Sequence, residues 1–379
     1  MEVVIEQSQQ LVRFPLTLAI CKDCQLVQIK EELASKDVFP DSYPYLSGTT
    51  QILRKNFANQ YLEVNAFIPL TKTDLLVDIG SNDGTLLSNY INTCEVIGIE
   101  PTSAAAIAQK NGIRTWKTFF DRNAAEKILK TLGKAKVVTA CNVFAHIPDL
   151  KSLMSNVVDI LRPDGVFVTE SHYLYSLLEN LQFDTIYHEH LRYYSVTFLN
   201  RLFSDFNFEI IRVQSIQTHG GSIRVWAAKK GVFTPDESVK LFLNDEEQFS
   251  SRHSNTLENF ADRVLEWRYK FCDFISSLKA EGLVIGAIGA PSRASTLISF
   301  SGLSHLEIVA VGEISTSHKI GRYMPGTRIP VVDERKLVEN QPDYLLLLSW
   351  HIAEELMPKL REIGFRGRFI IPLPELRVI

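Results

Sequence analysis

Short apolar runs alternate with amphipathic stretches through the middle of the chain. The apolar runs have the length of buried strands and occur at 75–79, 95–99, 137–140 and 166–169. Stretches with the apolar period of a helix lie between them, near 85–90, 103–110, 123–132 and 150–161. We predict an α/β fold with a parallel sheet covered by helices, because strands buried on both faces are apolar throughout.

Two further apolar segments follow a predicted helix at 196–206. They occupy 208–213 and 222–228, close enough in sequence to pair antiparallel. A doubly wound parallel sheet that ends in an antiparallel pair is typical of the class I methyltransferase fold, which we therefore predict for this region.

A charged, helical stretch at 235–282 leads into a second α/β pattern. Strands are predicted at 283–288, 308–311, 344–348 and 368–371, and a turn at 289–292 opens a helix that ends near residue 300. The first fifty residues differ from both patterns, and a predicted helix at 50–66 follows them. We predict three domains: a small N-terminal domain at 1–52, a doubly wound domain at 53–232, and a C-terminal Rossmann-like α/β domain at 233–379.

Composition excludes several classes of protein. Hydrophobic residues make up 45% and charged residues 22% of the chain, which is typical of globular proteins. The net charge of -4, without a basic stripe, gives no reason to expect nucleic acid as a partner. The apolar runs are too short for a membrane span, the N-terminus is acidic, and the five cysteines are scattered. We expect a cytoplasmic protein with no membrane partner.

A loop with two glycines directly follows the first predicted strand of the sheet. It reads Asp78-Ile79-Gly80-Ser81-Asn82-Asp83-Gly84, and Glu100 stands at the end of the next strand. Glycines let a ligand approach the backbone, and doubly wound sheets bind ligands at the carboxyl ends of their strands. An acid at the position of Glu100 can accept hydrogen bonds from ribose hydroxyls, so the pattern indicates a nucleoside site.

Three interpretations of this loop compete. A nicotinamide dinucleotide would place its pyrophosphate at a helix N-terminus, where Asp83 would repel it. S-Adenosylmethionine carries a sulfonium and an ammonium group, which acidic side chains suit. A turn without any ligand would make the glycines and the aligned acid a coincidence. The residues favour S-adenosylmethionine.

Several short motifs occur along the chain in the order of one enzyme family. They are CKDCQLVQ at 21–28 with the aromatic loop to Ser47, the loop at 80–84, NVFAH at 142–146, YHEH at 187–190, HGGSIR at 219–224, GAPSR at 289–293, GRYMPGT at 321–327 and PLPE at 372–375. In this order they span nearly the whole chain, which resembles the nucleotide-sugar C-methyltransferases, such as the 3-C-methyltransferases of branched deoxysugars.

The resemblance implies C-methylation of a 4-keto nucleotide-activated deoxysugar, a small molecule bound between the methyltransferase and C-terminal domains. A histidine removes the proton beside the ketone, and the enolate takes the methyl group of S-adenosylmethionine. Histidine suits this task because its usual pKa lies near 6.5. The catalytic residues implied are His190 as the base, with Tyr187, Glu189, His146 and a tyrosine of the N-terminal loop, Tyr45 or else Tyr43.

The expected binding residues fall into two sets. Those for the methyl donor are Asp78, Gly80, Ser81, Asn82, Asp83, Gly84, Glu100 and Asn142. Those for the substrate are Tyr43, His219, Arg224, Arg293 and Arg322. Arginines can bind a diphosphate with two prongs, and the turn at 286–290 could offer backbone N–H groups to phosphate. Glu313 resembles a ribose-binding acid, although the full Gly-x-Gly-x-x-Gly pattern is missing.

Alternatives stay open on the residues alone. The YHEH run also fits a solvated loop, His146 a loop or helix-cap histidine, and the two C-terminal arginines a solvated surface. An O- or N-methyltransferase of a related small molecule would need a base but no enolate stabilisation, and a degenerate binding protein would need neither. The family's zinc site has four cysteines, of which Cys21 and Cys24 supply two, so we expect a remnant of a zinc-binding domain and no metal site.

Overall fold

The computed structural model describes residues 14–41, 43, 45–252 and 256–379, and the chain forms two compact units. The N-terminal unit consists of Thr17–Tyr175 and His188–Arg252. The C-terminal unit consists of Ser176–Tyr187 and 256–379, with 14–16. Within the part of the chain that the structure describes, no helix combines the length and the apolar character needed to span a bilayer.

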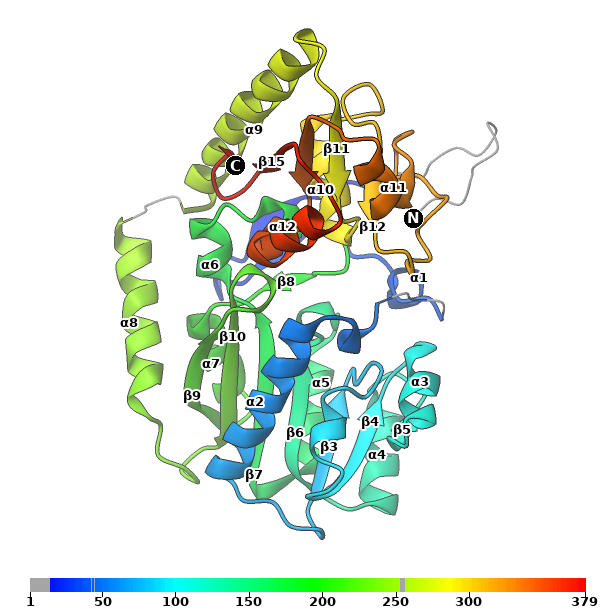
Figure 1. Ribbon diagram of the computed structural model, residues 1–379. Coiled ribbons are helices and arrows are strands. Elements are labelled where there is room, and N and C mark those ends of the chain that lie inside the picture. Colours follow the sequence, from blue (N-terminus) through cyan, green and yellow to red (C-terminus); the bar gives the residue numbers. More distant parts are fainter. Residues whose placement is uncertain (1–13, 42, 44, 253–255) are drawn as a thin grey trace. The chain divides into compact units, whose positions relative to one another are not determined.

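The N-terminal unit is built on a seven-stranded sheet with the order β5-β4-β3-β6-β7-β10-β9 (Figure 1). Its strands are parallel except for β10, which pairs antiparallel with both β7 and β9. This order confirms the predicted class I methyltransferase fold. The strands are β3 (Leu75–Ile79), β4 (Glu95–Ile99), β5 (Thr115–Trp116), β6 (Ala135–Cys141), β7 (Leu161–His172), β9 (Phe208–Ile216) and β10 (Ser222–Lys229).

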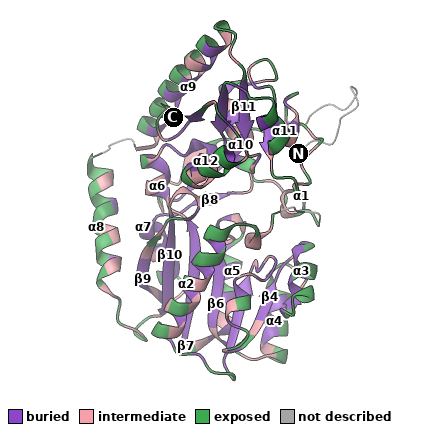
Figure 2. Ribbon diagram, in the orientation of Figure 1, coloured by how far each residue is buried: buried purple, intermediate pink, exposed green. Residues whose placement is uncertain are grey.

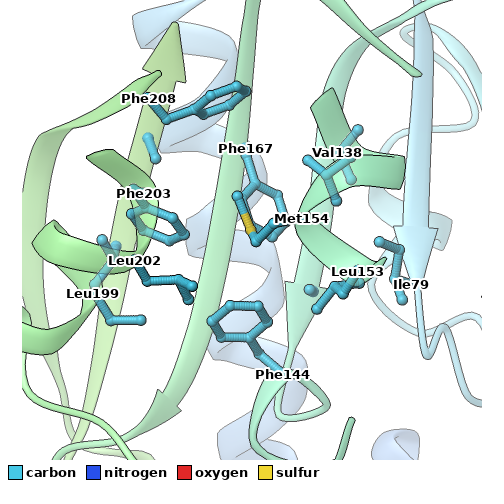
Figure 3. Close-up of a cluster of buried hydrophobic side chains, with 14 of the residues drawn as sticks. Ile79, Val138, Phe144, Leu153, Met154, Phe167, Leu199, Leu202, Phe203 and Phe208 are labelled. Carbon is cyan, nitrogen blue, oxygen red and sulfur yellow. The ribbon is translucent and has the colours of Figure 1, made fainter. Parts of the chain in front are cut away.

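Apolar side chains alternate between the two faces of this sheet, as the period of a strand requires. Val77 and Ile79 join one core with helices α4, α5 and α7, whereas Leu76 joins a second core with α2. Figure 3 shows part of the first core, where Phe144 and Met154 lie close to Phe167. The helices of the unit are α2 (Gln51–Phe67), α3 (Ala104–Lys110), α4 (Arg122–Thr131), α5 (Leu150–Ile160), α7 (Val196–Ser204) and α8 (Glu237–Arg252). Their outer faces are exposed while the strands are buried (Figure 2).

A smaller, three-stranded antiparallel sheet takes two of its strands from the N-terminal part of the described chain. It has the order β1-β2-β8. The strands are β1 (Leu18–Ile20), β2 (Val27–Ile29) and β8 (Arg192–Tyr193). Two short helical turns, α1 (Ser35–Val38) and η1 (Ser47–Thr49), follow β2. Because β2 pairs with β8, this sheet joins the N-terminal segment to the segment that follows the YHEH motif.

The predicted helix near 85–90 is wrong. The segment consists of turns and a short 3-10 helix, η2 (Leu87–Asn89). The side-chain amide of Asn89 donates to the carbonyl oxygens of Thr85 and Leu86, which an α-helix would use for its own backbone. Asp83 also binds the N–H and hydroxyl of Thr85 and turns the chain there. Side chains of this kind favour turns over helix for the same reason.

The C-terminal unit contains a second sheet, with the order β13-β12-β11-β14-β15-β16. All its pairs are parallel except β15 with β16. The predicted strand at 308–311 begins only at Val311. The strands are β11 (Ile285–Ile288), β12 (Val311–Glu313), β13 (Val331–Asp333), β14 (Tyr344–Leu347), β15 (Arg368–Ile371) and β16 (Arg377–Val378). The helices include α9 (Thr256–Ala280), α10 (Ser292–Ser301), α11 (Glu334–Glu339) and α12 (Ala353–Glu362).

The compact units differ from the predicted domain limits of 1–52, 53–232 and 233–379. Helix α8 stays with the N-terminal unit, because its buried Glu246 accepts hydrogen bonds from the N–H groups of Val196 and Thr197 at the start of α7. The short stretch Ser176–Tyr187 belongs to the C-terminal unit, where Asp184 pairs with Arg293. The helical stretch predicted at 235–282 is thus two helices, one in each unit.

Candidate functional site

The glycine loop lies at the carboxyl ends of β3 and β4. Gly80 has a φ of +70°, its N–H donates to the carbonyl of Ile99 (2.8 Å), and a Cβ there would lie 2.6 Å from the side chain of Val143. Glu100 is 5% exposed and accepts from the N–H of Asn82 (2.9 Å) and from the hydroxyl of Thr102 (2.6 Å). The structure therefore brings the predicted loop and acid together at one edge.

Negative charge collects at this edge. Among the described residues, Asp78, Asp83 and Glu100 form no ion pair. Burial raises the pKa of Asp78 to about 7; a hydrogen bond from Thr139 (2.6 Å) opposes the rise, and the charge of Glu100 adds to it. A cationic ligand would relieve this repulsion, since an opposite charge favours the ionised carboxylate.

Two polar atoms at the same edge are candidates for contacts with a ligand. Within the described chain, the side-chain oxygen of Asn142 and the hydroxyl of Ser81 are buried without a hydrogen bond. Asn142 follows β6 with a φ of +55°, and its N–H donates to the carbonyl of Glu170 (2.7 Å). Buried polar groups are normally satisfied. These residues and the acidic edge fit S-adenosylmethionine, whose ammonium group is a donor and whose sulfonium is a cation.

Asn82 and Asp83 have a different set of contacts from the one expected. Asn82 accepts from the N–H of Ser47 (2.9 Å) and donates to the carbonyl of Tyr45 (3.0 Å). Asp83 accepts from the N–H of Gly48 (2.9 Å), where a Cβ would lie 2.6 Å from the hydroxyl of Thr85. The aromatic loop is therefore held directly on the glycine loop. Sequence reasoning placed both elements in the site but did not predict this contact.

Four histidines form a chain of ring contacts. The ring centroid of His190 lies 5.1 Å from that of His146 and 4.7 Å from that of His172, and His172 lies 5.5 Å from His219. His190 is 6% exposed. These residues come from the loop after β6, the end of β7, the segment before β8 and the turn before β10. All four positions lie at the edge of the sheet that carries the glycine loop, because β10 runs opposite to β7.

His146 is neutral at neutral pH. Burial lowers the pKa of its imidazole to about 4, and the backbone of Glu189 and of Asn142 opposes this shift. Its Nδ1 is buried and has no hydrogen-bond partner among the described residues. Phe39, from the aromatic loop region, packs on its ring with 5.3 Å between centroids. His146 can therefore donate or accept a hydrogen bond without bringing a charge.

The backbone around His190 is fixed from two sides. The N–H of Leu191 donates to Ala145 (3.1 Å), next to His146, and its carbonyl accepts from Ile29 (3.0 Å) in β2. Arg192 donates to the carbonyls of Ile147 (2.7 Å) and Pro148 (2.6 Å). The N-terminal hairpin thus holds the segment that carries His190 and the loop that carries His146.

The tyrosines and Glu189 take separate positions. Tyr43 donates to the carboxylate of Glu189 (2.6 Å). Tyr45 is 40% exposed. Tyr187 is partly buried and belongs to the C-terminal unit, whereas its neighbour His188 belongs to the N-terminal unit. The structure therefore brings together two predicted site residues, Tyr43 and Glu189, that are 146 positions apart.

Arg224 is buried inside the N-terminal unit, with its side chain 1% exposed. Its guanidinium donates to Glu170 (3.0 Å), Glu63 (2.6 Å) and the side chain of Asn56 (2.8 Å). All three of its nitrogens have protein acceptors. This network joins α2 to β7 and β10. Sequence reasoning expected a substrate contact and did not find these partners, which are distant in the chain.

Gly84 and His219 also have local contacts. Gly84 lies against the side chains of Ala108 and Ile113, so it serves the packing of α3. His219 has a φ of +55° in the turn η5 (Thr218–Gly220), and its ring faces His172.

In the C-terminal unit, Arg293 forms a buried pair with Asp184. Two guanidinium nitrogens bind the two carboxylate oxygens at 2.8 and 2.9 Å, and the third lies 2.9 Å from Nδ1 of His351. The ring of Trp350 lies 4.8 Å from the guanidinium, and its indole N–H donates to Asp184 (2.8 Å). Arg322 is partly exposed in the loop before β13. The structure thus gives the two predicted arginines very different surroundings.

The carboxylate of Glu313, at the end of β12, binds the turn predicted to bind phosphate. Its carboxylate accepts from the N–H of Ala290 (2.6 Å), at the start of α10, and Lys319 donates to the carbonyl of Ala290 (2.6 Å). A carboxylate therefore fills one donor of the turn in this structure.

Cys21 and Cys24 lie at the turn of the β1–β2 hairpin, and both are free thiols. Hydrogen bonds from the backbone of Cys24 and of Asp23 lower the pKa of the Cys21 thiol. Among the residues that the structure describes, no group of three or more His, Cys, Asp or Glu side chains could hold a metal ion.

Sequence reasoning missed His172 and Asp184. His172 ends β7, which extends three residues beyond the predicted strand at 166–169, and a histidine shortly after a strand at this edge was a usable signal. Asp184 carried no such signal, because its role depends on a partner 109 residues away.

Two family models together match most of the chain. Residues 217–374 match a family model described as the C-methyltransferase C-terminal domain, and residues 54–213 match a methyltransferase domain. The protein named C-methyltransferase NovU, from Streptomyces niveus, is 33% identical over 370 residues, which cover 97% of this chain and 88% of that protein.

Solved structures include two similar chains. The magnesium protoporphyrin IX methyltransferase ChlM from Synechocystis PCC 6803, with bound SAM, has 13% identity and a TM-score of 0.39, and the match covers 53% of this chain and 100% of that one. A SAM-dependent methyltransferase from Anabaena variabilis ATCC 29413 has 18% identity and a TM-score of 0.38, with the same coverage of 53% and 100%.

Proposed function

Since the chain belongs to the C-methyltransferase family and its methyl donor is S-adenosylmethionine, we propose that it methylates a carbon beside the ketone of a 4-keto nucleotide-activated deoxysugar. The observation that carries this proposal is the buried His190, which lies in ring contact with two other histidines at the edge that carries the glycine loop.

A carbon nucleophile explains why a base is needed at this edge. The sulfonium of S-adenosylmethionine activates the methyl group, but a C–H bond beside a ketone is a poor acid. His190 takes the proton, the electron pair of the C–H bond forms the enolate and then the new C–C bond, and the donor leaves as a thioether. A positioned base of this kind contributes about 10²–10⁴-fold to the rate.

The enolate oxygen needs hydrogen-bond donors that do not lose their protons. Neutral His146 and the hydroxyl of Tyr45 serve this purpose in our proposal. The carboxylate of Glu189 positions Tyr43 through their 2.6 Å hydrogen bond. The ring of His219 and the hydroxyl of Tyr43 contact the sugar.

The arginines divide by their surroundings. Arg322 is the proposed partner of the diphosphate, because it is partly exposed. Arg293 supports the same region with the one nitrogen that faces His351, while Asp184 fixes its other two. Arg224 holds Glu170 and α2 in place and therefore acts on the substrate only indirectly.

The test uses S-adenosylmethionine and a panel of 4-keto nucleotide sugars, with mass spectrometry of the sugar. We expect one panel member to gain a methyl group that NMR assigns to carbon. A methyl group on oxygen or nitrogen would overturn the proposed reaction.

The role of His190 is tested in deuterated water without the methyl donor. We expect the wild type to exchange the proton beside the ketone for deuterium and His190→Gln to be slower by about 10²–10⁴-fold, the usual contribution of a general base. His188→Gln is the matched control and should retain most of the exchange. Equal exchange in His190→Gln and the wild type would place the base elsewhere, with His146 as the first candidate.

A further inference from the structure

Each turnover of the proposed reaction leaves one proton behind. The substrate loses a proton from carbon and gains a methyl group, so the proton stays on His190 when the product leaves. His190 is 6% exposed, and it must lose this proton before it can act as a base again. A buried base that works repeatedly needs a route for the proton. The following inference rests on the proposed function of His190.

His172 is placed to supply that route. Its ring centroid lies 4.7 Å from that of His190 and 5.5 Å from that of His219, with interplanar angles of 51° and 47°. At these separations the tilted rings touch. An imidazole can accept a proton on one nitrogen and release another from its second nitrogen, with a usual pKa near 6.5. His172 and His219 are both partly exposed, unlike His190.

The backbone holds the three rings in order. His172 ends β7 and pairs with Ser222 at the start of β10, and the N–H of Tyr173 donates to Gly221 (3.2 Å). His219, in the turn just before β10, therefore lies next to the end of β7 that carries His172.

Other titratable groups near His190 are less suited to the task. Burial lowers the pKa of His146 to about 4, so that ring does not hold a proton at neutral pH. Glu189 accepts the hydroxyl proton of Tyr43 in a hydrogen bond (2.6 Å). Glu170, close by on β7, is fully buried and paired with Arg224.

We propose that His172 is a proton-relay residue. It takes the proton from His190 after methyl transfer and passes it through His219 to water, while a proton already on its second nitrogen is the one released. The relay moves protons only and involves no oxidation or reduction. Each catalytic cycle releases one proton to solvent for each methyl group transferred.

The first test needs no sugar. In protein labelled with ¹⁵N-histidine and saturated with S-adenosylhomocysteine, NMR measures how fast the ring N–H of His190 exchanges with water. His172→Phe keeps a ring against His190 but removes both nitrogens. We expect the exchange of His190 to slow by about 10²-fold, the lower end of the contribution of a positioned proton-transfer group.

His188→Gln is the matched control, because it removes an imidazole of the same segment that has no role in the proposed reaction. In this variant the exchange of the His190 ring N–H should equal that of the wild type. An unchanged or faster exchange in His172→Phe would overturn the relay, since a purely structural role opens the site to water. Calorimetry with S-adenosylmethionine confirms that each variant is folded. This test stands even if no sugar of the panel is methylated.

The second test separates the first turnover from later ones. With the panel member that gains mass, His172→Phe should complete one turnover at the wild-type rate and then slow by about 10²-fold. In His172→Ala, added imidazole should restore the later turnovers. A first turnover as slow as the later ones would make His172 a positioning residue and overturn the relay. If His190→Gln is fully active in the same assay, the proposed base fails instead.

Discussion

The two larger sheets, one in each unit, repeat one backbone arrangement. In the N-terminal unit, Gly80 follows β3 with a φ of +70° and donates its N–H to the last residue of β4 (2.8 Å). In the C-terminal unit, Gly289 follows β11 with a φ of +87° and donates to Gly312 in β12 (2.9 Å). Each glycine also lies tightly on the residue that follows the neighbouring strand, Val143 or Ser349.

An acid completes both arrangements. Glu100 directly after β4 accepts from an N–H of the loop after β3 (2.9 Å), and Glu313 at the end of β12 accepts from the N–H of Ala290 (2.6 Å). A positive φ at the glycine and an acid at the next strand are what a nucleoside site of a doubly wound sheet requires.

The two edges differ in charge. The first edge carries Asp78, Asp83 and Glu100, and within the described residues no basic side chain pairs with them. The second edge combines Glu313 with Lys319 and the nearby Arg293. The backbone can therefore form the same cradle twice, while the side chains decide whether the ligand is a cation or an anion.

The largest expected effect comes from filling the two cradles. In Gly80→Ala the new Cβ would lie 2.6 Å from Val143, and in Gly289→Ala it would lie 2.5 Å from Ser349. Both variants should lose similar stability, about 1–2 kcal/mol for a left-handed alanine. Calorimetry should show that Gly80→Ala weakens S-adenosylmethionine binding by about 100-fold or more, since about 2.8 kcal/mol of lost contact has that effect. Equal losses of affinity in both variants would end the distinction between the edges.

The acids provide the second comparison. Glu100→Gln removes the charge that accepts ribose hydroxyls and should weaken donor binding by about 10–100-fold, because hydrogen bonds to charged groups contribute about 1.5–3 kcal/mol. Glu313→Gln is the matched control and should leave the donor affinity at the wild-type value. Unchanged affinity in Glu100→Gln, measured by calorimetry, would remove Glu100 from the donor site.

The local pattern of the sequence was enough for the sheet and the glycine loop. Apolar runs predicted β3, β4, β6 and β7, because a strand buried on both faces has few polar residues. The glycine loop and Glu100 were found for the same reason: their role depends on position relative to a strand. The failed helix near 85–90 depended on Asn89, whose side chain takes backbone carbonyls.

Contacts between distant segments were beyond the local pattern. Nothing in the residues around Arg224 shows that Glu170 and Glu63 surround it, and so a buried ion-pair network was interpreted as a substrate contact. The family resemblance supplied His190 and His146, but it did not supply His172. A ring contact of two histidines, one at the end of β7 and one in the segment before β8, depends on how these distant segments meet in the fold.

The buried carboxyl of Asp78 should make the stability of the fold depend on pH. Its pKa in the folded protein is about 7, above the usual 3.8. Between pH 3.8 and 7 the folded state therefore keeps a proton that the unfolded state has released. This contribution to stability is present at low pH and is lost as the pH rises toward 7. Asp78→Asn cannot ionise and should therefore gain stability relative to the wild type between about pH 4 and 7 in thermal unfolding.

The same residue links donor binding to pH. A bound cation favours the ionised carboxylate, so donor binding should lower the pKa of Asp78 below about 7. As the pH rises through the interval between these two pKa values, the donor affinity of the wild type should rise by about tenfold for each unit of the shift. In Asp78→Asn this rise below pH 7 should be absent. Parallel slopes in the two proteins would show that Asp78 stays protonated in the complex.

The smallest effect is expected at the second edge, with thymidine diphosphate as the probe. Arg322 is partly exposed, and an exposed charged contact contributes about 0.2–1 kcal/mol, so Arg322→Ala should weaken binding by about 1.4- to fivefold at low salt. The loss should shrink as salt rises, because added ions screen exposed charges.

Arg293→Ala is unsuitable here, since it leaves Asp184 buried without its partner. Arg322→Lys keeps the charge but loses the two-pronged geometry, and it should fall between the wild type and Arg322→Ala. If calorimetry gives the same affinity for all three proteins, the diphosphate does not use Arg322, and the second cradle needs another explanation for its basic side chains.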